Sequence, residues 1–273
     1  MKPIVKWVGG KTQLLDKIKE KLPAEYNTYY EPFLGGAAVL LDLNPTKAVV
    51  NDINTELINM YRQIKNDPAA VELCLSQIDV IHAMMDAQET YYEVRDAFNN
   101  DLGTNTITQA ARFIYLNKHC FNGLYRVNSK GQFNVPFNGR LKGVSFTPGH
   151  FKKVATIFQD VDIRCGNYED TVLEAQKGDL VFFDSPYAPL NPTSFVDYTK
   201  EGFGYEDHVK LAEIFKELTN RGVYCILTNH DTPLIRELYK DFTIDVVDVR
   251  RSINRKGSGR KGTEVIITNY QVK

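Results

Sequence analysis

Short apolar segments of strand length alternate with amphipathic segments of helical length in the first and last parts of the chain. Strands are predicted at residues 28–33, 47–52, 160–165, 178–184, 223–229, 242–249 and 263–270, and helices at 37–43, 54–65 and 206–220. This alternation is typical of an α/β fold, with a mostly parallel sheet and helices on both faces. The last two strands are expected to pair with each other across a basic loop.

Between residues 55 and 159 the strand signal disappears. Apolar positions there recur with the period of a helix, and the connectors are rich in Asn and Gly. We therefore predict two domains. Residues 1–54 and 160–273 form a discontinuous α/β domain, and residues 55–159 form an inserted, mainly helical domain.

Polar residues and glycines follow three of the predicted strands. Gly35-Gly36 comes after the first strand, Asp52 ends the second, and Asp184 ends the apolar run "GDLVFF". Ligands of open parallel sheets bind at the carboxyl ends of the strands. Glycines there let the backbone approach a ligand closely, and a carboxylate such as Asp52 accepts hydrogen bonds from ribose hydroxyls. The sequence thus predicts a site for an adenosine-type ligand.

Two common nucleotide motifs are absent from the sequence. No G-x-G-x-x-G follows Phe33, and "GGKT" at residues 9–12 lacks the preceding glycine of a P-loop. The predicted ligand is therefore an adenosine derivative without a pyrophosphate.

Charge is distributed unevenly, although the net charge is only −1. No Asp or Glu occurs from Leu102 to Gln159, whereas that span holds Arg112, Lys118, Arg126, Lys130, Arg140, Lys142, Lys152 and Lys153. A second acid-free basic run covers residues 250–262. Aromatic and amide side chains are interleaved with the first set of charges. This pattern predicts binding to a polyanion, and we favour nucleic acid over solvated loops.

The cysteines and histidines do not have the spacing of a metal site, and the lack of a long apolar segment bears on where the protein acts. The four cysteines form no C-x-x-C, so we expect reduced, buried thiols. The histidines lack the spacing of metal ligands, and His119, His150 and His230 are expected at the surface or in caps. With 43% hydrophobic residues and no long apolar segment, the chain is expected to be cytoplasmic, with no membrane contact.

The residues after the fourth strand indicate a reaction. An exocyclic amino group of a base is a poor nucleophile, because its lone pair is delocalised into the ring. A carboxylate and a backbone carbonyl that accept its two N–H groups would favour a tetrahedral nitrogen and stabilise the developing positive charge. Asp184, Ser185, Pro186 and Tyr187 supply the acid, a rigid turn and a stacking ring. We interpret this stretch as a site of amino-group methylation.

Six motifs occur in an order that resembles one enzyme family. They are "KWVGGK" (6–11), "EPFLGG" (31–36), "NDIN" (51–54), "FNGLYRVNSKGQFNVPF" (121–137), "DSPYAPL" (184–190) and "LTNHD" (227–231). The chain resembles the Dam family of S-adenosylmethionine-dependent DNA adenine-N6 methyltransferases, with the cofactor motif before the recognition region and the catalytic motif last. The resemblance implies a Rossmann-like catalytic and cofactor-binding domain. It also implies that residues 55–159 recognise DNA through a hairpin.

The resemblance implies roles for individual residues. The catalytic residues are Asp184, Ser185, Pro186 and Tyr187, with N6 held by Asp184 and the Ser185 carbonyl and the adenine stacked on Tyr187. The cofactor residues are Trp7, Lys11, Phe33, Gly35, Gly36, Asp52, Ile53, Tyr168 and Asp184. The DNA-binding residues are Lys6, Phe121, Asn122, Leu124, Arg126, Pro136, Arg140, Arg255 and Lys256. Leu124, Arg126 and Pro136 match positions that read base edges, and Arg126 suits guanine.

The implied function is methyl transfer from S-adenosyl-L-methionine to adenine N6 in double-stranded DNA by base flipping, with GATC as the expected target. We expect a monomer, and whether a cognate restriction endonuclease accompanies it stays open. Ser185 replaces a common proline and Ala37 a common glycine, while Asn138 and Leu141 depart from the pattern beyond Pro136. A catalytically weakened or inactive DNA-binding relative is therefore one alternative. A methyltransferase acting on RNA or protein glutamine is another, which the hairpin motif disfavours.

Overall fold

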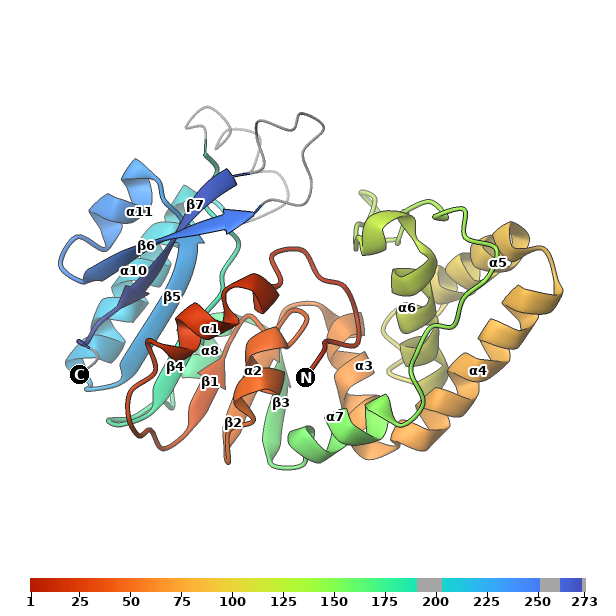
Figure 1. Cartoon of the computed structure of the whole chain (residues 1–273), viewed down its shortest axis with the longest axis horizontal. Helices are drawn as coiled ribbons and strands as arrows, with labels where there is room; N and C mark the ends of the chain where they lie inside the picture. The colour runs from red at the N-terminus through yellow and green to blue at the C-terminus, as the bar shows by residue number, and fades with distance from the viewer. Residues whose placement is uncertain (191–202, 251–260, 272–273) are drawn as a thin grey trace. The chain divides into compact units, whose positions relative to one another are not determined.

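The computed structural model describes residues 1–190, 203–250 and 261–271. Its sheet has seven strands in the order β3-β2-β1-β4-β5-β7-β6 (Figure 1). The strands are β1 (Tyr29–Glu31), β2 (Ala48–Asp52), β3 (Val161–Cys165), β4 (Leu180–Phe183), β5 (Tyr224–His230), β6 (Thr243–Arg250) and β7 (Lys261–Thr268). The pairs β1–β2, β1–β4 and β4–β5 are parallel, whereas β7 runs antiparallel to both β5 and β6. The predicted mostly parallel sheet, with its last two strands paired, is confirmed.

The chain divides into two compact units, which are described separately. The first unit comprises residues 1–10, 35–44 and 51–166, and the second comprises residues 11–34, 45–50 and 167–273. Both units are discontinuous in sequence, and residues 48–52 of strand β2 are shared between them.

The second unit holds most of the sheet and, among its described residues, five short or medium helices. These are η1 (Lys11–Gln13), α1 (Leu15–Lys19), α8 (Tyr168–Val172), α10 (Tyr205–Asn220) and α11 (Pro233–Leu238). Helix α10 lies along β5 (Figure 1). Its residues Leu211 and Phe215 belong to a buried cluster with Phe183 and Leu227. All four residues of β4 are buried, and Phe183 at its end packs in this cluster, so the strand is held up to its carboxyl end.

The first unit is mainly helical. It contains α2 (Ala38–Leu43), α3 (Thr55–Asn66), α4 (Pro68–Met84), α5 (Ala87–Asn100), α6 (Ile107–His119), η2 (Phe121–Gly123) and α7 (His150–Phe158), together with β3. Helix α6 packs against α3, α4 and α5, so it forms the centre of this bundle. The side chains of Asn54, Asp67, Asp86 and Thr106 each accept a backbone N–H at the start of a helix. These caps explain where α3 to α6 begin.

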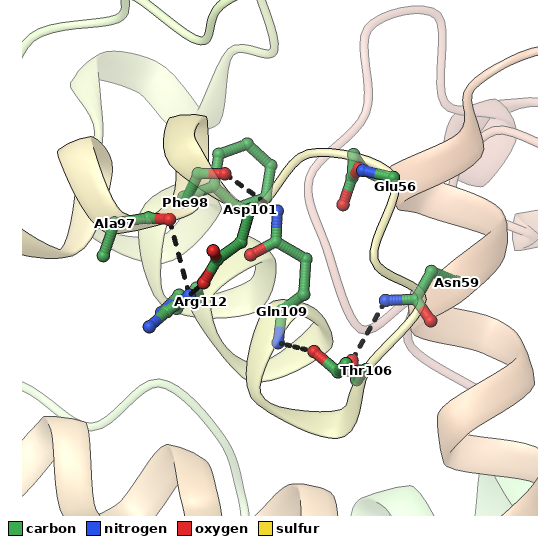
Figure 2. A network of polar contacts seen from close by, with 9 residues as sticks. Glu56, Asn59, Ala97, Phe98, Asp101, Thr106, Gln109 and Arg112 are labelled. Carbon is green, nitrogen blue, oxygen red and sulfur yellow. Dashed lines mark hydrogen bonds and ion pairs between the residues drawn. The ribbon is translucent and has the colours of Figure 1, made fainter.

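A polar network joins three helices of the first unit (Figure 2). Asn59 of α3 donates to the Thr106 carbonyl at 3.1 Å, and the Thr106 hydroxyl accepts the Gln109 backbone N–H at 3.1 Å. Arg112 of α6 pairs with Asp101 at 2.5 Å just beyond α5. The connector between α5 and α6 is thereby bonded to α3 and α6, which restrains its conformation.

The predicted hairpin at residues 121–137 forms only two isolated antiparallel bridges, Cys120–Phe137 and Val127–Phe133. A regular ladder is absent from this stretch because side chains of α5 take up backbone groups of its returning half, as described below. The chain reversal itself is present.

Two predictions about single residues are wrong. His119 is only 4% exposed, because its ring stacks on Tyr115 at 4.5 Å and its Nε2 lies 3.2 Å from the Ser145 hydroxyl. Cys165 is exposed at the end of β3, while Cys120 and Cys225 are buried as expected. Within the described ranges, no group of three or more His, Cys, Asp or Glu side chains is placed to hold a metal ion. No helix in the same ranges has the length and apolar content needed to cross a bilayer.

Candidate active site

Asp184 follows the last residue of β4, where the strand ends beside β5. Its Oδ1 lies 2.6 Å from the ammonium nitrogen of Lys11 and accepts the hydroxyl of Thr228 at 2.9 Å. The Asp184 side chain is 18% exposed and that of Lys11 only 4%. Burial raises the pKa of Asp184 above its ordinary value, and the charge of Lys11 and the Thr228 hydroxyl oppose this rise. One carboxylate oxygen is therefore fixed by the protein.

The turn after Asp184 is tied to the end of β5. The Ala188 N–H donates to Oδ1 of Asn229 at 2.9 Å, and the Ala188 carbonyl lies 2.8 Å from Nδ1 of His230. Ser185 is buried, and its hydroxyl oxygen has no partner within the described residues. Pro186 is exposed. Since both polar groups of Ala188 are engaged, the short turn has a fixed path.

The ring of Tyr187 is held on three sides. Its hydroxyl donates to Glu264 of β7 at 2.9 Å, and the ring of His230 meets it edge-on at 4.8 Å. The ammonium of Lys11 lies 4.7 Å from the ring centre. Burial raises the pKa of Tyr187 well above its ordinary value, with Asp184 and Glu264 adding to the effect. Tyr187 is therefore a neutral, oriented aromatic surface beside a carboxylate.

An aromatic group lies elsewhere in the second unit. Phe33, just after β1, stacks on Tyr168 at 4.8 Å, and Phe203 meets Phe33 edge-on at 5.9 Å. The Tyr168 hydroxyl is buried without a partner among the described residues. Burial raises the pKa of Tyr168 above its ordinary range. Apolar rings with one unsatisfied hydroxyl suit a planar ligand that carries hydrogen-bonding groups.

In the first unit, Asp52 meets the glycine turn. Its Oδ2 accepts the Gly35 N–H at 2.9 Å, and its Oδ1 accepts the Asn54 N–H at 2.9 Å. Tyr61 donates to the Gly35 carbonyl at 3.0 Å. Burial raises the pKa of Asp52, and the backbone hydrogen bonds oppose this rise. Each carboxylate oxygen accepts one hydrogen bond and retains further acceptor capacity, which fits a ribose diol. The neighbouring Ile53 is 80% exposed.

Trp7 packs directly over the glycine turn. A Cβ added to Gly35 would lie 2.7 Å from Cδ1 of Trp7, and one added to Gly36 would lie 3.3 Å from the Trp7 Cβ. Gly35 has φ +48°, a conformation that favours glycine. The ring of Trp7 also stacks on Tyr125, with 5.5 Å between the ring centres. The turn therefore requires glycine both for its backbone conformation and for the close approach of an indole ring.

The hairpin is joined to the N-terminal segment in the same unit. Asn117 of α6 accepts the Lys6 N–H at 2.8 Å and donates to the carbonyls of Lys6 at 2.9 Å and Gly123 at 3.1 Å. The Phe121 N–H donates to the Pro136 carbonyl at 2.8 Å. The buried side-chain amide of Asn117 thus fixes the start of the hairpin next to Lys6.

Most predicted DNA-binding side chains are accessible. Phe121 is 53% exposed, and Leu124 is half-buried. The remaining exposed members are Lys6, Asn122, Arg126, Pro136 and Arg140. A largely exposed phenylalanine beside cationic side chains fits a surface that contacts stacked bases. Arg255 and Lys256 lie outside the described residues.

The model of the D12 class N6 adenine-specific DNA methyltransferase family matches residues 7–253. The chain belongs to this family. Its relatives include the Type II methyltransferase M1.LlaDCHI of Lactococcus lactis subsp. cremoris, which is 43% identical over 99% of this chain and 96% of the relative. M.MjaIII, a Type II methyltransferase of Methanocaldococcus jannaschii, is 41% identical over 99% of both chains. The DNA adenine methylase of Escherichia coli K12 is 36% identical over 98% of this chain and 94% of the relative.

The protein is thus an adenine-specific DNA methyltransferase that uses S-adenosyl-L-methionine, and its substrate is DNA. The predicted family, enzyme class and cofactor are confirmed. Residues of each unit, taken separately, fit parts of such a cofactor: in the first unit Asp52 offers two acceptor oxygens. In the second unit Tyr168 holds a buried hydroxyl without a partner among the described residues.

The structure brings several predicted residues together within each unit. Lys11, Asp184 and Tyr187 are in contact, as are Phe33 and Tyr168, while Trp7, Gly35 and Asp52 surround one turn. Sequence reasoning missed four residues that hold predicted site residues or the turn after them in place. Thr228 bonds Asp184, Glu264 bonds Tyr187, Asn229 bonds Ala188 in the turn, and Asn134 bonds Arg126. Thr228 and Asn229 belong to the motif "LTNHD", which the sequence analysis identified, but the motif alone did not indicate what these residues contact.

Proposed function

We propose that this methyltransferase modifies N6 of adenine in GATC sites of duplex DNA, after the adenine has left the base stack. The observation that supports this most strongly is the environment of Asp184. One of its oxygens is fixed by Lys11 and Thr228, and the carboxylate remains 18% exposed at the end of a buried strand. A carboxylate so held keeps one orientation while it accepts a hydrogen bond.

Asp184 and the Ser185 carbonyl accept the two N–H groups of N6 in this proposal. Together they favour a tetrahedral nitrogen and stabilise the positive charge that develops on it. Tyr187, held by Glu264 and His230, stacks on the flipped adenine. Pro186 restricts Ser185 to an extended conformation, so the direction of the Ser185 carbonyl is kept although Ser185 replaces proline. The bound cofactor supplies an electrophilic methyl group.

The residues assigned to the cofactor are described separately for each unit. Asp52 holds the ribose hydroxyls, while Gly35 and Gly36 allow a close approach and Ile53 and Trp7 lie beside them. In the second unit, Phe33 and Tyr168 take the adenine of the cofactor between apolar surfaces. Lys11 contacts the cofactor as well as Asp184.

The hairpin reads the target sequence. Phe121 and Asn122 occupy the space that the flipped adenine leaves, and Leu124, Arg126 and Pro136 contact base edges. Lys6 also reaches a base. Arg140, Arg255 and Lys256 bind phosphates, which adds affinity but little sequence information.

Three broader expectations belong to the same proposal. We expect a monomer that acts in the cytoplasm. A cognate restriction endonuclease is expected if the protein serves the same purpose as the relatives named Type II methyltransferases.

Methyl incorporation from labelled S-adenosylmethionine tests the proposal. Duplexes would carry GATC or each of its single-base-pair variants. Efficient incorporation only with GATC is expected, and Asp184→Ala should lower kcat by at least about a hundredfold. Asp162→Ala is the matched control, because Asp162 is an exposed carboxylate that pairs only locally with Arg164 at 2.8 Å. This control should keep wild-type activity.

Other outcomes would overturn parts of the proposal. Specific DNA binding without incorporation would indicate an inactive relative that lost catalysis through Ser185. Incorporation into RNA or protein glutamine, but not DNA, would show a different substrate. Equal incorporation into all duplexes would contradict GATC specificity.

A further inference from the structure

Arg126 and Asn134 face each other across the hairpin. The Nε of Arg126 donates to the Asn134 side-chain oxygen at 2.8 Å, and its Nη2 donates to the Asn134 carbonyl at 3.3 Å. The Asn134 N–H donates back to the Arg126 carbonyl at 3.1 Å. One asparagine therefore binds both the side chain and the backbone of the predicted base-reading arginine.

The two contacts engage a particular edge of the guanidinium group. A guanidinium carries five N–H bonds in one plane, and the Nε–H and the nearer Nη2–H form its side edge. Asn134 takes this side edge. The end edge, with parallel N–H bonds on Nη1 and Nη2, is not used in these contacts, and Arg126 is exposed.

Asn134 is itself held by its neighbours. The side-chain amide of Asn99 in α5 accepts the Phe133 N–H at 2.8 Å and donates to the Phe133 carbonyl at 3.0 Å. Tyr91 of α5 donates to the Val135 carbonyl at 2.8 Å. Phe133 and Val135 are 3% and 2% exposed. Because residues on both sides of Asn134 are anchored to α5, the asparagine has a fixed position.

We propose that Asn134 is a positioning residue for base recognition. It holds the side edge of Arg126, so that the end edge is presented to O6 and N7 of a guanine. The inference rests on the proposed role of Arg126 as a base-reading residue. Beyond that role, the inference specifies that the end edge of Arg126 contacts the base and that Asn134 sets the orientation of the guanidinium.

The physical reason is pre-organisation. A free arginine side chain has many rotamers and loses that freedom when it binds. It also reaches phosphate oxygens and other acceptors, which reduces discrimination between bases. In the major groove, G offers two adjacent acceptors, whereas A offers one acceptor and one donor. A guanidinium has only donors. When its side edge is already occupied, its end edge can form two hydrogen bonds with G but only one with A.

Asn134→Ala tests the inference through the discrimination ratio, which is kcat/KM for the GATC duplex divided by that for each variant duplex. At the one base pair that Arg126 reads, the ratio should fall by about fivefold or more. Ratios at the other base pairs should change by less than about twofold, because their contacts are made by other residues. Asn134→Asp keeps the acceptor oxygen and should restore the ratio at that base pair. Its negative charge should lower affinity for all duplexes alike.

Two further variants separate this inference from the proposed function. Arg126→Ala should abolish discrimination at one base pair, and Asn134→Ala should add nothing in that background. If Arg126→Ala leaves every ratio unchanged, the proposed role of Arg126 fails. If Arg126→Ala has its effect but Asn134→Ala does not, only the positioning role is wrong.

Asn128→Ala is the matched control for disturbance of the hairpin. The Asn128 side chain accepts the N–H groups of Lys130 and Gln132 in the turn, at 2.9 and 3.0 Å. Its loss should lower affinity for all duplexes without a selective effect. The same selective loss in Asn128→Ala as in Asn134→Ala would show that any damage to the turn suffices, and would overturn the inference.

Discussion

The ammonium nitrogen of Lys11 lies 2.6 Å from Oδ1 of Asp184 and 4.7 Å from the centre of the Tyr187 ring. One buried cation thus contacts both the carboxylate and the aromatic ring of the stretch Asp184–Tyr187. Lys11 comes from the stretch "KWVGGK" near the N-terminus, so this stretch also affects the electrostatics of Asp184. Removing one partner of a buried pair leaves the other charge uncompensated.

Lys11→Met should shift the pH dependence of methylation. Burial raises the pKa of Asp184 and Lys11 lowers it, so loss of Lys11 raises this pKa further. Because the proposed role of Asp184 requires the carboxylate form, the rate should fall as the pH drops through this pKa. The acid limb of the kcat profile, measured at saturating DNA and cofactor, should therefore move to higher pH. Thr228→Val removes only a neutral hydrogen bond and should cause a smaller shift in the same direction. An acid limb that stays in place in Lys11→Met would contradict this prediction.

Ser185→Ala should stabilise the protein and leave catalysis nearly unchanged. The Ser185 hydroxyl is buried without a partner among the described residues, and a buried unsatisfied hydroxyl costs about 1–3 kcal/mol. The backbone carbonyl proposed to hold N6 is retained. We expect a free energy of unfolding higher by about 1 kcal/mol and a kcat within about twofold of wild type. Chemical denaturation and steady-state methylation measure the two quantities. A large loss of kcat would show that the hydroxyl itself takes part in catalysis.

The strands of the sheet could be predicted because their signals are local. The apolar run ending at Phe183 became β4, and the helix predicted from residue 54 became α3, with Asn54 as its cap. Each of these features depends on residues within a few positions of one another. The basic span and the motif order likewise gave the enzyme class without any contact between distant residues.

Contacts between distant residues left no such signal. Nothing near Lys11 in the sequence indicates that it pairs with Asp184, because the two meet only when η1 and β4 come together in the folded second unit. His119 was expected at the surface or in a cap, but an imidazole is buried readily when Ser145 and Tyr115 offer partners. The predicted hairpin has two isolated bridges in place of a regular ladder, because hydrogen bonds with Asn99 engage backbone groups of its returning half. The roles of the individual site residues remain predictions.

Gly35→Ala should damage both stability and cofactor binding. The new Cβ would lie 2.7 Å from Trp7 at a residue with φ +48°, so strain and a clash combine. We expect a loss of about 2–4 kcal/mol in the free energy of unfolding and at least about tenfold weaker cofactor binding. Gly103→Ala is the control, because Gly103 has φ +79° but nothing within 4 Å of an added Cβ. It should cost about 1 kcal/mol and leave cofactor affinity unchanged. Similar effects of the two variants would show that Trp7 does not limit this turn.

Ala37→Gly should be tolerated better than Ala38→Gly. Both alanines are buried, at 0% and 7% exposure, so both variants lose a buried methyl group and gain freedom in the unfolded chain. Ala37 has φ +57°, a left-handed conformation that costs an L-residue about 1–2 kcal/mol, whereas Ala38 begins helix α2. The free energy of unfolding of Ala37→Gly should therefore exceed that of Ala38→Gly by about 1–2 kcal/mol, measured by urea denaturation. Equal values would mean that the turn holds Ala37 without strain, and the common glycine at this position would then need another explanation, such as space for the cofactor.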